Sequence, residues 1–134
     1  MSLDDSIDQF LNGTPFAVIG ASRNRDKYGN KVLRCYLQND HRVFAINPNA
    51  DEVEGMPAHA DLASLPEPVH GISIITPPSV TELIVEQAVS LGIQNIWMQP
   101  GADSPTAIAT ARQASLNLIS GTACLLVVLG FSDQ

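Results

Sequence analysis

The sequence predicts an α/β protein with a doubly wound, parallel sheet of about five strands between two layers of helices. Short apolar runs alternate along the chain with segments of helical periodicity, which is the pattern of repeated βαβ units. The first apolar run, 16–19, leads into a turn of small residues, Gly20-Ala21-Ser22. The 134 residues fit one domain, and no repeat, linker or low-complexity stretch divides them. We therefore expect a single Rossmann-like domain over residues 1–134, with three α/β/α layers.

The first part of the chain predicts two helices and one strand. A short leading helix over 4–12 precedes the strand at 16–19. A second helix runs from about residue 30 to 39, and apolar side chains recur on one face of it: Val32, Leu33, Tyr36 and Leu37. Lys31 and Arg34 fall on the opposite face, so we expect Arg34 to be solvated.

The second strand is expected over 42–46. It ends at Asn47-Pro48, because the residue before a proline is disfavoured in helical geometry. Residues 49–68 are less regular and predict only a single turn near 62–65. The third strand, 71–76, is continuously apolar and stops at Pro77-Pro78.

The last third of the chain predicts two more helices and two more strands. Ser79-Val80-Thr81-Glu82 has the pattern of a capping box, which predicts a helix from there to about Leu91. A strand at 95–98 follows. Ser104-Pro105 then supplies a cap and a first-turn proline for a helix ending near residue 115. The next strand is 116–119.

The apolar run at 125–131 permits two interpretations. Residues 125–129 are expected to add a sixth extended segment, either as a buried final strand or as a surface for dimer formation. The run is far too short to span a bilayer, and Met1–Asp5 lacks the pattern of a signal peptide. Two cysteines, Cys35 and Cys124, make no disulfide framework or zinc motif. We expect a soluble, cytoplasmic protein with reduced thiols.

The charge pattern is uneven. The net charge is -7, yet six of the seven basic residues are clustered in one segment: Arg23, Arg25, Lys27, Lys31, Arg34 and Arg42. The overall acidity argues against general nucleic-acid binding. The segment follows the Gly20 turn, where a strand, a turn and a helix start can hold a phosphate against backbone N–H groups. We therefore expect a ligand with several phosphates, held in part by Arg23, Lys27 and, from the first turn of the helix, Lys31.

The sequence contains no recognisable catalytic group. His41, His59 and His70 are scattered, and Ser22 lacks evident histidine and acid partners for a nucleophilic triad. A metal site is not expected, since His59 with Asp61 gives only two ligands. Whether the protein is an enzyme therefore stays open, and a binding protein is the favoured interpretation.

Two nucleotide ligands are disfavoured. The dinucleotide fingerprint is absent, because the next glycine after Gly20 is Gly29, and Asn47 stands where an acidic residue would hold a ribose. NADP is not excluded, since an arginine can take that role. A Walker motif for ATP is also missing.

Five short motifs in order resemble those of the CoA-binding domain family, similar to the N-terminal domain of the succinyl-CoA synthetase alpha subunit. They are Val18-Ile19-Gly20-Ala21-Ser22, Tyr28-Gly29-Asn30, Ile46-Asn47-Pro48, Ile75-Thr76-Pro77-Pro78 and Ile96-Trp97-Met98-Gln99-Pro100-Gly101. The resemblance covers about residues 14–125. Thr122-Ala123-Cys124 departs from it by losing a polar neighbour of the cysteine. The phosphohistidine domain of the synthetase is not expected here, so its chemistry is not carried over.

The resemblance implies a coenzyme A site. Gly20, Ala21, Ser22 and the following loop would approach the pyrophosphate, and Arg23 and Lys27 would supply charge to the phosphates. The adenine and pantetheine path would be lined by two further segments: Asn47-Pro48 and Thr76-Pro77-Pro78. Gln99 belongs to the most specific motif, and Trp97 or Tyr28 could stack on a base.

We therefore expect a non-catalytic carrier, sensor or subunit that binds coenzyme A or an acyl-CoA, alone, as a homodimer or with a partner enzyme subunit. The alternative is an NAD(P)-binding module or oxidoreductase subunit. A third hypothesis is an interaction subunit that kept the fold and lost the ligand.

Overall fold

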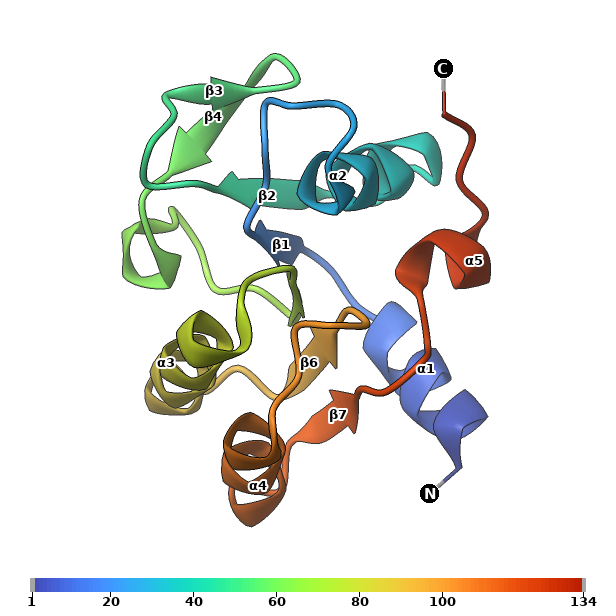
Figure 1. Ribbon diagram of the computed structural model, residues 1–134, viewed down its shortest axis with the longest axis vertical. Coiled ribbons are helices and arrows are strands. Elements are labelled where there is room, and N and C mark those ends of the chain that lie inside the picture. The colour runs from blue at the N-terminus through green and yellow to red at the C-terminus, as the bar shows by residue number, and fades with distance from the viewer. Residues whose placement is uncertain (1, 134) are drawn as a thin grey trace.

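The computed structural model describes residues 2–133, in which a seven-stranded sheet is covered by helices on both faces (Figure 1). The strands are β1 (Phe16–Ile19), β2 (Val43–Ile46), β3 (Glu52–Val53), β4 (Met56–His59), β5 (Gly71–Ile74), β6 (Asn95–Met98) and β7 (Asn117–Ile119). The helices are α1 (Leu3–Leu11), α2 (Tyr28–Gln38), α3 (Pro78–Ser90), α4 (Pro105–Gln113) and α5 (Leu125–Leu129), with a 3₁₀ turn, η1 (Leu62–Ser64). The predicted doubly wound α/β class is confirmed.

The order of the strands is β3-β4-β2-β1-β5-β6-β7. All pairs are parallel except β3 with β4. The chain moves outward from β1 to β2 on one side and starts again at β5 on the other. The strand order therefore reverses between β1 and β5, and the carboxyl ends of these strands are where such sheets bind ligands.

Two of the seven strands lie in the segment that the sequence left irregular. β3 and β4 form an antiparallel hairpin whose turn residues, Glu54 and Gly55, have φ values of 51° and 77°. Two successive positive φ angles are typical of the tight turns that join paired strands. The glycine at the second position was the signal in the sequence, but a two-residue strand such as β3 is too short to show alternation.

The two faces of the sheet carry separate apolar cores (Figure 1). α3 and α4 cover one face, while α1, α2 and α5 cover the other. On the second face Phe16 stacks on Tyr36 at 4.9 Å and on Phe10 at 5.2 Å. Trp97 is fully buried beside them and donates its indole N–H to the Ala123 carbonyl at 3.0 Å. Trp97 is therefore a core residue and is not exposed for stacking on a base.

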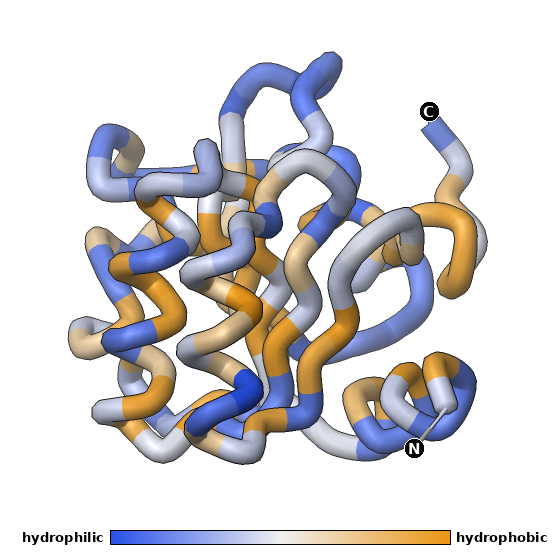
Figure 2. The backbone as a smooth tube through the Cα atoms, turned by 60° about the horizontal axis from the view of Figure 1, so that its bottom comes forward, coloured by the Kyte–Doolittle hydropathy of each residue, from blue (hydrophilic) through white to orange (hydrophobic). Residues whose placement is uncertain are grey.

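Residues 125–129 form a helix, so the expectation of a sixth extended segment there is wrong. A short apolar run does not distinguish a strand from a buried helical turn. Leu125 is fully buried in the second core, whereas Val127 is 80% exposed. Figure 2 shows hydrophobic residues along the central strands and again at α5, beside the C-terminus.

The prediction that Arg34 lies on a solvated face is also wrong. Its exposure is 5%, because α5 and the residues after it cover that side of α2. The guanidinium ion-pairs with Asp133 at 3.0 Å, a partner 99 residues away in the sequence. Helical periodicity reveals only which residues share a face, and a distant segment can cover a polar face as well as an apolar one.

The two predicted helix caps had different outcomes. Ser104 caps α4 as expected, since its hydroxyl accepts a hydrogen bond from the Ala107 N–H at 3.0 Å. The capping box at Ser79 is wrong, because α3 already begins at Pro78 and its N-cap, Pro77, offers no side-chain acceptor. Proline suits the first helical position through its fixed φ, so the helix starts two residues before the one that a cap at Ser79 would give.

Within residues 2–133, none of the helices combines the length and the apolar character that crossing a membrane requires.

Candidate functional site

A cleft of about 740 Å³ lies at the carboxyl ends of β2, β1 and β5, where the strand order reverses. Four segments line it: 20–22, 26–29, 47–49 and 75–77. The loops that follow β1, β2 and β5 therefore meet in one place. The loop after β6 does not line this cleft.

Two glycines bring the backbone close together at the base of the cleft. Gly20 has a φ of 94°, and a Cβ atom there would overlap the carbonyl oxygen of Ile75. A Cβ on Gly29 would overlap the carbonyl oxygen of Gly20 itself. Gly29 thus allows α2 to approach the turn after β1, a role that the last glycine of the dinucleotide fingerprint has in related folds. The spacing differs from that fingerprint, which is why the sequence did not reveal the role.

Two amide side chains, the buried Asn30 and the half-buried Asn47, fix the direction of the turn. Asn47 donates to the Ala21 carbonyl at 2.9 Å, and Asn30 donates to the Ser22 carbonyl at 2.8 Å. In a trans peptide the following N–H points opposite to the carbonyl, so the N–H groups of Ser22 and Arg23 are turned away from these two side chains. Neither N–H has an acceptor within the part of the chain that the structure describes. Two successive free donors of this kind form an anion-binding concavity.

The start of α2 adds to this positive environment. Its N-cap, Lys27, supplies no side-chain acceptor for the first N–H groups of the helix. Uncapped N–H groups carry the partial positive charge of the helix dipole, which favours a phosphate. Lys27 itself lines the cleft, and its ammonium has no ion pair among residues 2–133. The turn, the helix start and one free cation therefore converge on one wall.

The other basic residues have different surroundings. Arg23 is exposed on the same loop but outside the cleft lining. Lys31 lies 3.5 Å from the Asp133 carboxylate and 5.8 Å above the ring of Tyr28. Arg25 pairs with Glu54 at 3.8 Å.

Arg42 lies at the opposite end of β2. Its guanidinium makes a two-pronged contact with the Glu67 carboxylate and stacks over Phe44 at 5.3 Å. Of the six clustered cations, only Lys27 lines the cleft directly.

Most of the predicted site residues meet at the cleft. Those that line it are Gly20, Ala21, Ser22, Lys27, Asn47, Pro48, Thr76 and Pro77. Those that do not line it are Arg23, Lys31, Pro78 and Gln99. Pro78 is the first residue of α3 and follows the cleft wall directly.

Gln99 is occupied elsewhere. Only 3% of it is exposed, and its side-chain oxygen accepts a hydrogen bond from the Leu125 N–H at 2.8 Å. Its amide nitrogen lies 3.4 Å from the Cys124 sulfur. The N-cap residue of α5, Cys124, makes no side-chain cap, so Gln99 caps this helix instead. The same contact joins α5 to the end of β6.

Four lining residues were not singled out as contacts: Asp26, Gly29, Asn49 and Ile75; Tyr28, considered for stacking on a base, also lines the cleft. Tyr28 is 61% exposed, so its ring is free to meet a planar ligand group. Asp26 introduces a carboxylate, whose sequence signal was hidden among the neighbouring cations.

The histidines and cysteines considered for catalysis or metal binding lie outside the cleft lining, whereas Ser22 is part of it. Within the described residues no three histidine, cysteine or acidic side chains come together in a way that could hold a metal ion. The His70 ring donates its Nε2–H to the Phe10 carbonyl, 2.9 Å away, and the His59 ring packs edge-on against Phe44. Burial, and then the nearby Cys124, raise the pKa of the Cys35 thiol to about 11, so Cys35 is mainly an unreactive thiol near neutral pH.

The fold and this cleft define a class of protein: an α/β domain with a cleft at the switch point of its sheet, where free N–H donors and a lysine suit an anion. Comparison with known proteins gives the family. The model of the CoA binding domain matches residues 14–130, so the chain belongs to the CoA-binding domain family.

Known relatives agree with this assignment. Over 71 residues the chain is 32% identical to an ADP-forming acetate–CoA ligase of Archaeoglobus fulgidus, a match that spans 53% of this chain and 10% of the ligase. A solved structure of a conserved hypothetical protein from Pyrococcus furiosus is similar at 34% identity and a TM-score of 0.81, covering 87% of this chain and 99% of that one.

A further structure extends the likeness of the fold to a large enzyme. The dinucleotide-forming acetyl-coenzyme A synthetase 1 of Candidatus Korarchaeum cryptofilum aligns with 84% of this chain at a TM-score of 0.71 and 20% identity. The aligned part is 27% of that synthetase.

Proposed function

We propose that this protein binds coenzyme A or an acyl-CoA in the cleft and acts as a carrier, sensor or subunit without a reaction of its own. The observation that carries the proposal is the pair of free N–H groups at Ser22 and Arg23 beside the uncapped start of α2. Membership of the CoA-binding domain family supports the choice of ligand.

The charges suit a ligand with three phosphate groups. The pyrophosphate would meet the 20–22 turn and the first N–H groups of α2, with Lys27 beside it. Arg23 and Lys31, at the edge of the cleft, are the cations available for the 3′-phosphate. Charge-assisted hydrogen bonds of this kind are about twice as strong as neutral ones.

The remaining walls suit the rest of the molecule. Tyr28 offers an exposed ring for the adenine, and Pro48 and Pro77 offer apolar surface to the pantetheine arm. Asn47 and Thr76 lie between these surfaces and the turn. We retain Pro78 as a neighbour of this wall and exclude Gln99 from the proposed contacts, since both ends of its amide are used internally.

An NAD(P)-binding module is the second candidate, and Asp26 is the observation that favours it. A carboxylate in the cleft can accept hydrogen bonds from ribose hydroxyls. Asp26 comes from the loop before α2, however, whereas the ribose-binding acid of such domains follows the second strand. Asn47 holds that position here and is engaged with the Ala21 carbonyl.

The role of carrier or subunit is proposed by likeness to a relative. The aligned region is a tenth of the Archaeoglobus acetate–CoA ligase, so the activity of that whole enzyme is not carried over to this chain. We propose that this single domain presents its ligand to a partner protein or a second copy of itself. The reducing cytoplasm is the compartment we propose, since Cys35 and Cys124 are both free thiols.

Native mass spectrometry followed by calorimetry tests the proposal. The purified protein should retain CoA or bind it when added, and dephospho-CoA should bind about tenfold more weakly if a cation contacts the 3′-phosphate. Equal affinities would remove that contact. Retention of NAD(P) in place of CoA would favour the second candidate, and binding of neither would reject both.

A further inference from the structure

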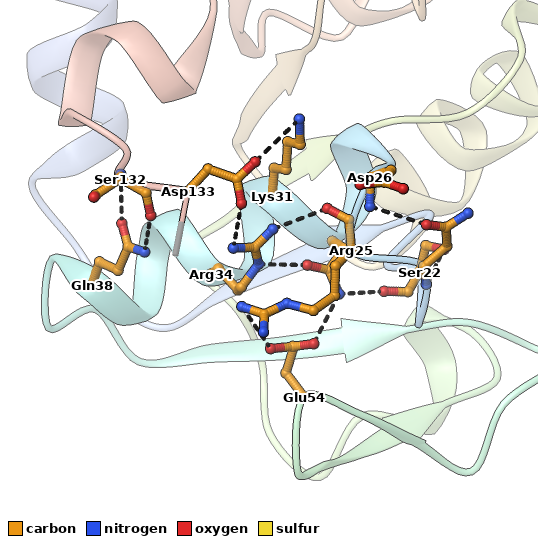
Figure 3. A network of polar contacts seen from close by, with 11 residues as sticks. Ser22, Arg25, Asp26, Lys31, Arg34, Gln38, Glu54, Ser132 and Asp133 are labelled. Atoms are coloured by element: carbon orange, nitrogen blue, oxygen red, sulfur yellow. Dashed lines mark hydrogen bonds and ion pairs between the residues drawn. The ribbon is translucent and has the colours of Figure 1, made fainter.

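Arg34 is a buried cation outside the cleft lining, yet its contacts lead to the cleft. The side chain is 6% exposed and makes three hydrogen bonds. They reach the Asn30 side-chain oxygen at 2.6 Å, the Arg25 carbonyl at 3.0 Å and the Asp133 carboxylate at 3.0 Å. Figure 3 shows the guanidinium between Asp133 and the backbone of the loop at Arg25.

Two of these bonds fix the phosphate-binding loop. Arg34 orients Asn30, whose amide nitrogen holds the Ser22 carbonyl at 2.8 Å. The same guanidinium holds the Arg25 carbonyl directly. Both carbonyls belong to the loop between β1 and α2, so the direction of the peptide N–H groups that follow them, those of Arg23 and Asp26, depends on where Arg34 lies.

The third bond connects this arrangement to the end of the described chain. Residues 130–133, here called the C-terminal strap, lie along α2 (Figure 3). Gln38 bonds the backbone of Ser132 in both directions, at 2.7 and 3.0 Å, and Asn39 donates to the Gly130 carbonyl at 3.2 Å. Arg34 also lies over the ring of Phe131 at 5.0 Å.

The charge balance explains why the strap matters. A buried guanidinium is costly unless a carboxylate or several acceptors surround it. Within residues 2–133 the carboxylate that pairs with Arg34 is that of Asp133. Asn30 and the Arg25 carbonyl are neutral acceptors, so Asp133 is the group that stabilises the charge in this place.

We propose that Arg34 is a positioning residue for the phosphate-binding turn, and that the C-terminal strap keeps it in position through Asp133. Docking of the strap and binding of the ligand are then thermodynamically coupled, and each strengthens the other by the same factor. The coupling to ligand rests on the proposed function, whereas the effect of the strap on the turn does not.

A purely structural role for Arg34 predicts a different effect of losing Asp133. Loss of Asp133 would then lower the stability of the whole fold or change nothing, with no selective effect on the loop. In a third alternative, the main effect of Asp133 is to ion-pair with Lys31, 3.5 Å away, and so to keep that cation from the ligand. Asp133 would then lower the affinity for the ligand. The three alternatives differ in which measurable quantity changes, and in its direction.

The test replaces Asp133, whose side chain is 54% exposed, so that folding is retained. Asp133→Ala should raise the hydrogen-exchange rate of the hydrogen-bonded loop amides, those of Asn24, Asp26 and Lys27, by about fivefold without ligand, since an ion pair with a half-exposed partner is lost. The amides of β1, β5 and β6 should be unchanged, Asp133→Glu should restore protection, and Asp8→Ala on α1 is the matched control. Unchanged protection of these loop amides, or equal loss everywhere, would overturn the proposal.

Calorimetry with CoA supplies the second readout. Asp133→Ala should weaken binding by about fivefold, the same factor as the loss of protection. Tighter binding would show that Asp133 competes with the ligand for Lys31 and would also overturn the proposal. Should the wild-type protein bind no CoA, the proposed function fails, and the exchange measurement still decides the role of the strap.

Discussion

At the carboxyl edge of the sheet, the helix N-termini in one half are capped by side chains, and those in the other half are not. Beside β6 the starts are closed by side chains, since Ser104 caps α4 and Gln99 caps α5. Beside β1 and β5 the starts of α2 and α3 have no side-chain cap. The cleft lies in this second, open half.

The difference in capping indicates which half of the edge can bind an anionic ligand. Capping side chains satisfy the N–H groups that would otherwise bind an anion, so a capped start has little left to offer a phosphate. The open half also contains the glycine turn and Lys27, so free N–H donors and a cation meet there beside the carboxylate of Asp26, in a protein of net charge -7. Binding capacity is thus concentrated at the point where the strand order reverses.

The largest effect is expected from a pair of glycines with matching backbone angles. Gly20 in the open half and Gly101 in the closed half have φ values of 94° and 93°. A Cβ at Gly20 would overlap a carbonyl, whereas one at Gly101 meets nothing within 4 Å. Gly20→Ala should cost about 3 kcal/mol or more through strain plus overlap, and should abolish CoA binding.

The control is Gly101→Ala, which should cost about 1–2 kcal/mol through strain alone and leave CoA affinity unchanged. Urea unfolding and calorimetry measure both variants. Equal effects of the two substitutions on binding would mean that the open half has no special role.

A second substitution disturbs the closed half only. Gln99→Leu keeps the volume of the side chain but leaves the buried Leu125 N–H without its acceptor. The free energy of unfolding should fall by about 1–3 kcal/mol, while CoA affinity stays within about twofold. A loss of binding as large as that of Lys27→Ala would return Gln99 to the site and place the ligand across both halves.

Removal of the free cation of the open half should weaken binding without loss of stability. Lys27→Ala should raise the Kd for CoA by about tenfold, since a charged hydrogen bond to phosphate is lost. The matched control is Arg112→Ala, an exposed cation in the last turn of α4. If the control weakens binding equally, only the overall charge matters.

The smallest expected effect is the loss of the Asp133 contact at acidic pH. The hydrogen bond from Arg34 holds the pKa of Asp133 below its ordinary value of 3.8, and the charges of Arg34 and Lys31 act in the same direction. A depressed pKa means that the contribution of Asp133 is fully present above pH 3.8 and is lost as the pH falls through the folded-state pKa. Amide chemical shifts of the C-terminal strap should show this transition, and Asp133→Asn should remove it.

The sequence was informative about the open half because its signals are local. A buried strand, Gly20-Ala21-Ser22 and a nearby cation lie within one short segment. Prolines and Asn47 mark the ends of the neighbouring strands in the same way. Local patterns of this kind predicted eight of the residues that line the cleft and the order of the main elements.

The errors have tertiary causes. Arg34 was assigned to solvent because its partner, Asp133, lies 99 positions further along the chain. The predicted ligand contact of Gln99 stays a prediction that the structure does not favour, since a motif shows proximity to a strand end but not that the amide is bonded within the protein. Gly29 was read as evidence against a fingerprint, although its lack of a side chain has the same packing role at a different spacing.

An amide-detected NMR titration with CoA tests the central claim most directly. The N–H groups of Ser22, Arg23 and Gly29, in the open half, should shift most and saturate together. The capped N–H groups of Ala107 and Leu125 should barely move. Shifts concentrated at Ala107 and Leu125, or the absence of saturable shifts at the 20–22 turn, would contradict the account.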